Sequence, residues 1–311
     1  MNEARSETQK DVPGIEKVKQ IFEATLPPYL PSQIINKDNL LRLKELQEQG
    51  YSSVIFYDHA TARDPIQILK LILDNKLTRD KEICFPIEAR LYNNSKLALE
   101  PIAGANKIKL CPIITQASLD WFDFQQKKKY EKAERSPKSN PDSLRKLEEK
   151  QRLKREKLTI EKNKYDRKYF KTVVDVIRKG GSAVIALQAT RKEWFEMPPA
   201  DEKSKVPPVV DTLMFYLDKA KLDKVAFLLI APSIEGEINY KLEKTGFLNP
   251  HRKYIMKIGP TYTKDKLKEP TIETAHSEGD QSKRIRRPAG KNVYAAFNEL
   301  VSPERKKPPV T

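Results

Sequence analysis

Residues 52–73 read SSVIFYDHATARDPIQILKLIL. The first part, residues 52–57, is short and rich in β-branched and aromatic residues, which predicts a buried β-strand. The last part, residues 66–73, has the length and composition of a helix, and Pro65 is tolerated in its first turn. His59 and Asp64 lie between the two. The stretch therefore predicts a strand, a short turn and a helix, which together are typical of an α/β sheet.

Segments of the same kind occur elsewhere in the chain. A helical pattern ends at Gly50, a good C-terminal cap, immediately before the strand. This pattern and others with helical periodicity cover residues 15–24, 38–49, 169–178, 212–220 and 293–301. Compact apolar runs predict further strands at residues 83–87, 108–114, 183–187 and 225–230. Because helices alternate with strands, we expect an α/β fold with a mixed central sheet flanked by helices.

The positive charge is concentrated in two segments. The formal net charge of the 311 residues is +16. Residues 127–168 contain 17 Lys/Arg against 8 Asp/Glu, a net of +9, and residues 281–311 contain 8 against 2, a net of +6. Clustered Lys and Arg attract polyanions such as anionic lipid, nucleic acid or an acidic protein. Since the rest of the chain is nearly neutral, the charge does not require a protein that coats nucleic acid.

These shifts in composition suggest a domain organisation. We expect an N-terminal helical segment at residues 1–50, an α/β domain at residues 51–270 and a flexible basic tail at residues 271–311. Residues 127–168 would form a charged helical hairpin inserted into the domain, with Ser, Pro and Asn residues at its turn. Apolar residues in the second arm are too sparse to favour a coiled coil, so a solvated insertion without a partner is one reading of the hairpin.

The cysteines and the apolar content bound the cellular environment. Cys84 and Cys111 lie in apolar surroundings without a metal-binding spacing, which predicts buried thiols in a reducing compartment. No apolar stretch approaches the roughly 20 residues that span a bilayer, and residues 1–12 are too polar for a secretory signal. We therefore expect a cytoplasmic protein, free in solution or peripherally bound to a membrane, with neither a metal nor a redox cofactor.

The turn after the first strand carries the first candidate for chemistry. His59 belongs to the residue type whose pKa lies near neutrality, and a carboxylate such as Asp64 fixes the tautomer of a histidine that acts as a general base. Five positions do not bring two side chains together on one helical face, so the turn itself would have to do so. The alternative is a surface or capping histidine beside a helix-capping aspartate.

Four blocks, taken in order, resemble the glycerolipid acyltransferases of the lysophosphatidic acid and glycerol-3-phosphate acyltransferase superfamily. The first is His-x4-Asp, met by His59 and Asp64, and the second is an arginine, best matched by Arg167. The third is a glycine turn, a strand and a Glu-Gly-Thr-Arg motif, matched by residues 179–191. The fourth is an apolar strand that ends in proline, matched by residues 225–232.

The resemblance implies a reaction and a set of roles. A hydroxyl of a phosphorylated glycerolipid would attack an acyl thioester, either acyl-CoA or acyl carrier protein, with His59 as base and Asp64 as its partner. Arg167 and Arg191 would bind the acceptor phosphate, for which planar guanidinium groups are suited. Each arginine has the alternative of an ordinary surface ion pair.

The third block departs from the family pattern at two positions. Gln188 stands where the family has glutamate, and Ala189 stands where it has glycine, while Thr190 and Arg191 are kept. Gln188 and Thr190 are still able to donate hydrogen bonds near a phosphate, although they would equally satisfy the end of the strand. The departures leave a second interpretation: a catalytically weakened relative that binds anionic membrane, or less favourably nucleic acid, through the basic segments.

Overall fold

The computed structural model describes residues 32–58, 64–77, 81–105, 107–136, 140–187, 209–234, 254–269 and 288–301. The strands are β1 (Ser32–Ile35), β2 (Ser52–Tyr57), β3 (Ile83–Glu88), β4 (Ile108–Ile113), β5 (Ser182–Ala186), β6 (Val225–Ile234) and β7 (Tyr254–Thr263). The helices are α2 (Asp38–Glu48), α3 (Asp64–Asp74), α4 (Ala89–Ala105), α5 (Gln116–Glu134), α6 (Pro141–Arg178), α7 (Val209–Lys219), α9 (Lys264–Lys268) and α11 (Pro288–Leu300).

The seven strands form one mixed sheet in the order β1-β7-β6-β2-β5-β3-β4. Strands β6, β2, β5, β3 and β4 are parallel, whereas β7 runs antiparallel to β6 and parallel to β1. The predicted α/β class with a mixed central sheet and flanking helices is confirmed.

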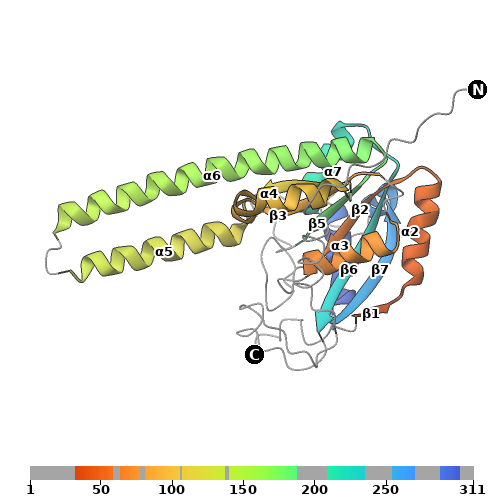
Figure 1. The fold of residues 1–311 in the computed structure, drawn as a ribbon, viewed down its shortest axis with the longest axis horizontal. Coiled ribbons are helices and arrows are strands. Elements are labelled where there is room, and N and C mark those ends of the chain that lie inside the picture. The colour runs from red at the N-terminus through yellow and green to blue at the C-terminus, as the bar shows by residue number, and fades with distance from the viewer. Residues whose placement is uncertain are drawn as a thin grey trace, which may run out of the picture.

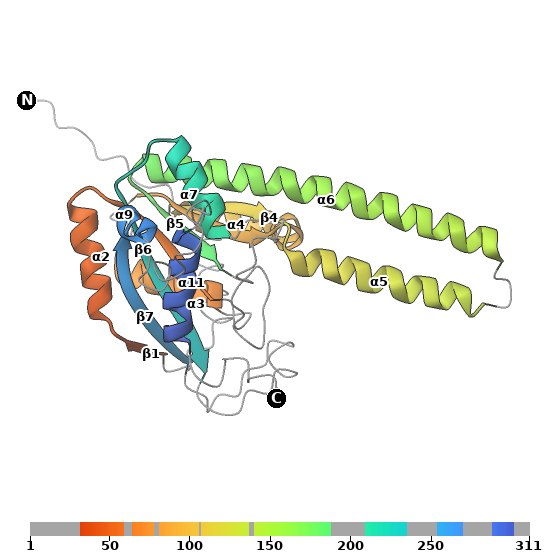
Figure 2. The same cartoon turned by 180° about the vertical axis from the view of Figure 1, so that it is seen from behind.

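Helices cover both faces of the sheet, so its central strands are apolar on both sides. Strand β2 is buried at all six positions, as expected for a strand in the middle of a covered parallel sheet. Its alternate residues enter different cores: Ile55 and Tyr57 pack with α2 and α3, and Val54 and Phe56 pack with α6, α7 and α11. Figure 1 shows the face with α2 and α3, and Figure 2 shows the face with α7, α9 and α11.

Helices α5 and α6 form the charged hairpin, which projects from the sheet (Figure 1). Helix α6 has 38 residues and is therefore about 57 Å long. It begins with a capping box at Asn140, and its last part, from Tyr169 to Ile177, packs on the sheet. The sequence predicted a separate helix at residues 169–178 after the insertion, and that boundary is wrong, because the second arm and the core helix are one continuous helix.

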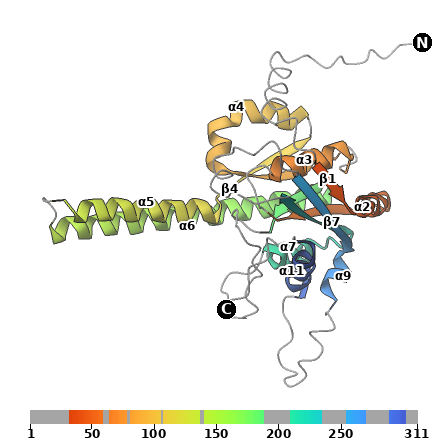
Figure 3. The same ribbon diagram turned by 90° about the horizontal axis from the view of Figure 1, so that it is seen from below.

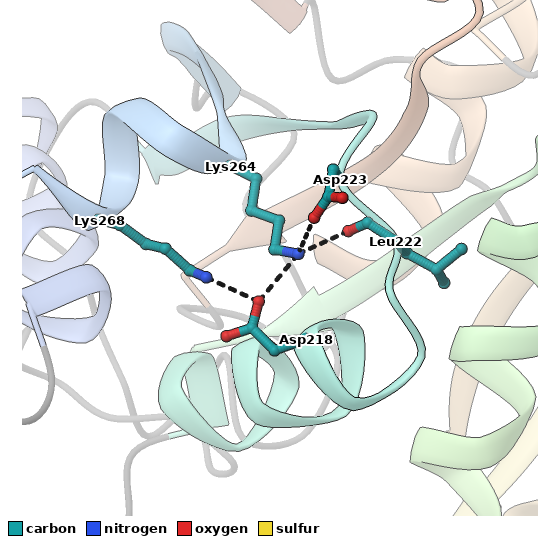
Figure 4. A network of polar contacts seen from close by, with 5 residues as sticks. All are labelled: Asp218, Leu222, Asp223, Lys264 and Lys268. Atoms are coloured by element: carbon teal, nitrogen blue, oxygen red, sulfur yellow. Dashed lines mark hydrogen bonds and ion pairs between the residues drawn. The ribbon is translucent and has the colours of Figure 1, made fainter.

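Helix α9, which follows β7, packs on one face of the sheet. Helix α9 places the ammonium group of Lys264 in a site that is 2% exposed, where it donates to the carbonyl of Leu222 at 2.8 Å, to Asp223 at 2.8 Å and to Asp218 at 2.9 Å (Figure 4). Lys268 also binds Asp218. Burial disfavours the charged form of Lys264, but the two carboxylates outweigh it and raise the pKa of this lysine. The network attaches α9 to the connection between α7 and β6.

Two predicted domain limits differ from the structure. Strand β1 pairs with β7, and α2 packs in the core with β2, so residues 32–48 belong to the α/β domain and not to a separate segment before residue 51. At the other end, residues 271–311 were expected to be a flexible tail. Helix α11 instead buries Val293, Phe297 and Val301 against the sheet, as the helical pattern of residues 293–301 had suggested. The N-terminal helix expected at residues 15–24 lies outside the described residues.

Candidate active site

The connections that follow β2 and β5 leave neighbouring carboxyl ends of the sheet for opposite faces. These strands are parallel neighbours, with Tyr57 opposite Ala186. The chain leaves β2 for α3 on one face of the sheet and leaves β5 for α7 on the other face. Figure 3 shows α3 and α7 on opposite sides of the sheet. A crevice outside the carboxyl ends of strands is expected where two adjacent connections diverge in this way, and such crevices commonly bind ligands.

The sheet also loses its pairing on the other side of β5. Strand β3 pairs with β5 only at Ile83–Ser182 and Cys84–Ala183, near the amino ends. Beyond that point the hydroxyl of Tyr169, from α6, donates to the carbonyl of Val184 at 2.8 Å. The Tyr169 side chain thus donates to a backbone carbonyl of β5 at a position where β3 no longer pairs with β5.

Asp64, which the sequence placed between a strand and a helix, is the first residue of α3 and is fully buried. A carboxylate at the amino end of a helix is stabilised by the helix dipole and by free backbone N–H groups. A buried charge also requires polar partners, and Asp64 has such interactions. Asp64 is therefore a buried carboxylate at a helix N-terminus and not a solvated surface carboxylate.

A second buried carboxylate, Asp58, stands at the end of β2 directly before His59. Its backbone N–H donates to the carbonyl of Ile230 at 3.3 Å, so it continues the pairing between β2 and β6. Burial, followed by the charges of Asp64 and Asp58, raises the pKa of the Tyr57 hydroxyl far above its usual value. Both carboxylates therefore act on the same tyrosine at the end of β2.

Two hydrogen bonds, one with β2 and one with α11, fix Leu187 at the end of β5. The backbone N–H of Leu187 donates to the carbonyl of Tyr57 at 2.9 Å, and the hydroxyl of Tyr294 donates to the carbonyl of Leu187 at 3.0 Å. Burial, followed by the charges of Asp211 and Asp58, raises the pKa of Tyr294 to about 12. Leu187 is the residue from which the predicted phosphate-binding segment departs, so helix α11 fixes the origin of that segment.

Asp211 in turn holds the first turn of α11. Its carboxylate accepts a hydrogen bond of 3.1 Å from the backbone N–H of Gly290. A Cβ atom at residue 290 would lie 2.5 Å from Asp211 Oδ2, so the close approach depends on glycine. The negative charge also lies at the positive end of the α11 dipole.

Only two of the predicted site residues fall within the described ranges. Asp64 lies at the diverging connections of β2 and β5 and is fully buried, whereas Arg167 is exposed on α6. His59, Gln188, Ala189, Thr190 and Arg191 lie outside the described residues. Among the described residues that flank them, 58 and 187 directly follow the adjacent strands β2 and β5, and 64 begins α3.

Sequence reasoning missed the contribution of Asp58 and Tyr294. Asp58 directly precedes the His-x4-Asp motif, and its position at the end of an apolar run could have drawn attention to it. Tyr294 lies in a segment with helical periodicity, but no local pattern indicates that its hydroxyl reaches Leu187, which is 107 positions away in the chain.

The sequence was compared with protein-family models and with curated proteins. No protein-family model matches the sequence, and no curated protein matches it. Among the described residues, no group of three or more His, Cys, Asp and Glu side chains is arranged to hold a metal ion. Within the same ranges, no helix combines the length and the apolar character that crossing a bilayer requires. The function must therefore be argued from the site itself.

Proposed function

We propose that the protein transfers an acyl group from a thioester, acyl-CoA or acyl carrier protein, to a hydroxyl of a phosphorylated glycerolipid at an anionic membrane surface. One observation carries the proposal: the His59–Asp64 stretch and the Gln188–Arg191 stretch leave adjacent parallel strands at the point where their connections diverge. The two stretches that the reaction needs thus start side by side.

In the proposed reaction, His59 removes the proton from the acceptor hydroxyl while its oxygen attacks the thioester carbonyl. Asp64, held at the helix N-terminus, keeps the imidazole in one tautomer and stabilises the imidazolium that forms. The tetrahedral intermediate then collapses, the C–S bond breaks, and His59 returns the proton to the departing thiolate. No metal or redox cofactor is needed for these steps.

The acceptor phosphate is assigned to the segment after β5. Arg191 would make charge-assisted hydrogen bonds to it, and Gln188, Ala189 and Thr190 would supply neutral donors from side chains or backbone. The fixing of Leu187 by Tyr294 supports this assignment, because a fixed strand end limits where the following residues lie. Arg167 has weaker support, since it is exposed on α6.

The test is acceptor-dependent thiol release from several acyl-CoA donors and from acyl carrier protein, with lysophosphatidic acid or glycerol-3-phosphate as acceptor. His59→Ala should lower kcat/KM at least roughly a hundredfold, which is the usual contribution of a general base. His276→Ala removes another of the three histidines and serves as the matched control. Absence of release from well-folded parent protein with every donor would refute the proposal and favour a binding protein.

A further inference from the structure

Helix α5 exposes an aromatic pair beside a lysine. Trp121 is 57% exposed and Phe124 is 46% exposed, and their ring centroids are 5.8 Å apart. The ammonium group of Lys128 lies 4.6 Å from the centroid of the Phe124 ring. We call these three residues the aromatic edge. Single exposed apolar residues are common on protein surfaces, but two large aromatic rings in contact form a patch that requires an explanation.

The aromatic edge points away from α6. The inner side of α5 is marked by Leu119, which packs near Leu158, and by the carbonyl of Gln126, which accepts from Gln151 at 3.2 Å. At 3.6 residues per turn, the aromatic edge lies on the opposite side of α5. It is therefore the outer border of the hairpin and not part of the contact between its arms.

This border lies on the same side of the domain as the candidate active site. Helix α5 starts directly after β4, and its first turn is tied to the carboxyl end of β3 by a hydrogen bond of 3.1 Å from Ser118 to Glu88. Helix α6 ends at the amino end of β5. Figure 1 accordingly shows α5 as the arm nearer the carboxyl ends of the parallel strands, and Figure 3 shows the two arms overlapping when viewed from that side.

We propose that the aromatic edge inserts into the headgroup region of an anionic bilayer. Tryptophan is enriched at this depth, and a lysine stem covers apolar surface while its ammonium group reaches the phosphates. The net charge of +9 over residues 127–168 supplies attraction to anionic lipid. The choice of a bilayer over an acidic protein rests on the proposed function, because a lipid acceptor resides in the bilayer and this contact turns the active-site side toward it.

The outer border of α6 offers a matched comparison. It carries Leu153 and Ile160, which are 47% and 49% exposed, among several lysines. These two residues are seven positions apart and so lie on one side of the helix. Because α6 is the arm farther from the strand carboxyl ends, this border faces away from the site. Exposed apolar side chains beside lysines thus occur on both borders, whereas the proposal requires only the border of α5.

The first experiment uses the fluorescence of Trp121. The chain has two tryptophans, so Trp194→Phe leaves Trp121 as the only one. Vesicles of phosphatidylcholine with an equal part of phosphatidylglycerol should shift its emission to shorter wavelength, and brominated lipid should quench it, while pure phosphatidylcholine should do much less. Unchanged emission with anionic vesicles, or a shift produced by acyl carrier protein and not by vesicles, would overturn the proposal.

The second experiment compares co-sedimentation of paired variants with the same vesicles. Trp121→Ser with Phe124→Ser should weaken binding roughly tenfold or more, because two aromatic side chains lose their apolar contact. Leu153→Ser with Ile160→Ser should bind like the parent protein, and the reverse order would refute the inference. Circular dichroism should show that each variant keeps its helices.

The vesicle assays contain no acyl donor, so they distinguish this inference from the proposed reaction. The His59→Ala protein should bind vesicles as the parent does. Binding through the aromatic edge without any thiol release would leave the surface assignment intact and refute the acyltransferase. Thiol release with soluble substrates but no vesicle binding would do the opposite.

Discussion

Replacing Tyr294 by phenylalanine should destabilise the protein near neutral pH and also remove one source of sensitivity to alkali. The hydroxyl of Tyr294 donates to the carbonyl of Leu187 at 3.0 Å, and both residues are buried. Phenylalanine leaves that carbonyl without this donor, which costs about 1–3 kcal/mol. For a domain of this size, each kcal/mol lowers Tm by about 2–4 °C, so the variant should melt roughly 2–12 °C lower.

The dependence on pH follows from the raised pKa. Burial, with the charges of Asp211 and Asp58, raises the pKa of Tyr294 to about 12 from an ordinary value of 10.0. The unfolded chain therefore ionises first, so the contribution of the neutral hydroxyl is fully present below pH 10 and is lost between pH 10 and pH 12. The free energy of unfolding falls by about 1.4 kcal/mol for each pH unit in this range. Phenylalanine has no such loss.

The assay is urea unfolding of parent and variant at about pH 8, 10 and 11, followed by circular dichroism. The difference in the free energy of unfolding should shrink by about 1 kcal/mol between the last two conditions. Tyr92→Phe, which removes an exposed hydrogen bond to Glu100, is the control and should cost about 0.5 kcal/mol or less. A gap between Tyr294→Phe and the parent that stays constant with pH would refute the reasoning.

Three further perturbations test other parts of the fold. Lys264→Met removes a buried ammonium group with three acceptors and should lower the free energy of unfolding by about 1.5–3 kcal/mol. Lys268→Ala, at a 40% exposed site, should lower it by about 1 kcal/mol or less. Equal losses of free energy in urea unfolding would contradict this. Gly290→Ala should lower Tm by a few degrees, because the new methyl would lie 2.5 Å from Asp211. Helix propensity alone predicts a rise in Tm, and such a rise would show that α11 can shift away from Asp211. The hydrogen bond with Cys111 and burial raise the pKa of Cys84, and both thiols are buried. Iodoacetamide should therefore modify neither thiol at neutral pH until urea unfolds the protein, which mass spectrometry would detect.

The parts of the fold that follow from local pattern were predictable. Strand β2 and helix α3 have the right lengths and compositions, and the bounds of α2 agree with its periodicity because Gly50, with φ of 87°, ends it. In each case, residues within or next to the short segment indicate where the strand or helix begins and ends. The strands predicted from compact apolar runs at residues 83–87, 108–114, 183–187 and 225–230 are confirmed as β3, β4, β5 and β6, because buried strands of a covered sheet contain apolar runs.

Strands β1 and β7 were missed for a physical reason. Strand β1 has four residues, and β7 contains Lys257, Gly259 and Pro260, so neither resembles a buried strand in isolation. They are strands because β7 pairs with β6 and β1 pairs with β7. Pairing between distant segments overrides weak local preference, and a single sequence carries little record of it.

The false boundary within α6 has a different origin. Composition changes near Lys168 from charged to apolar, which suggested that one helix ends and another begins. Half-buried positions instead recur at spacings of three and four from Leu144 to Tyr165, so the helical period never breaks. The change marks the place where the helix stops facing α5 and starts facing the sheet.

The same distinction applies to the candidate site. The sequence was sufficient to predict that Asp64 lies between a buried strand and a helix, because both elements are local. It was not sufficient to predict that α11, in a basic segment taken for a tail, would reach the end of β5. A net charge averaged over residues 281–311 hides the buried positions Val293, Phe297 and Val301, which repeat every four residues. Periodicity within a charged segment is therefore better evidence of folding than its average charge, and here it is the periodic part that supports the site.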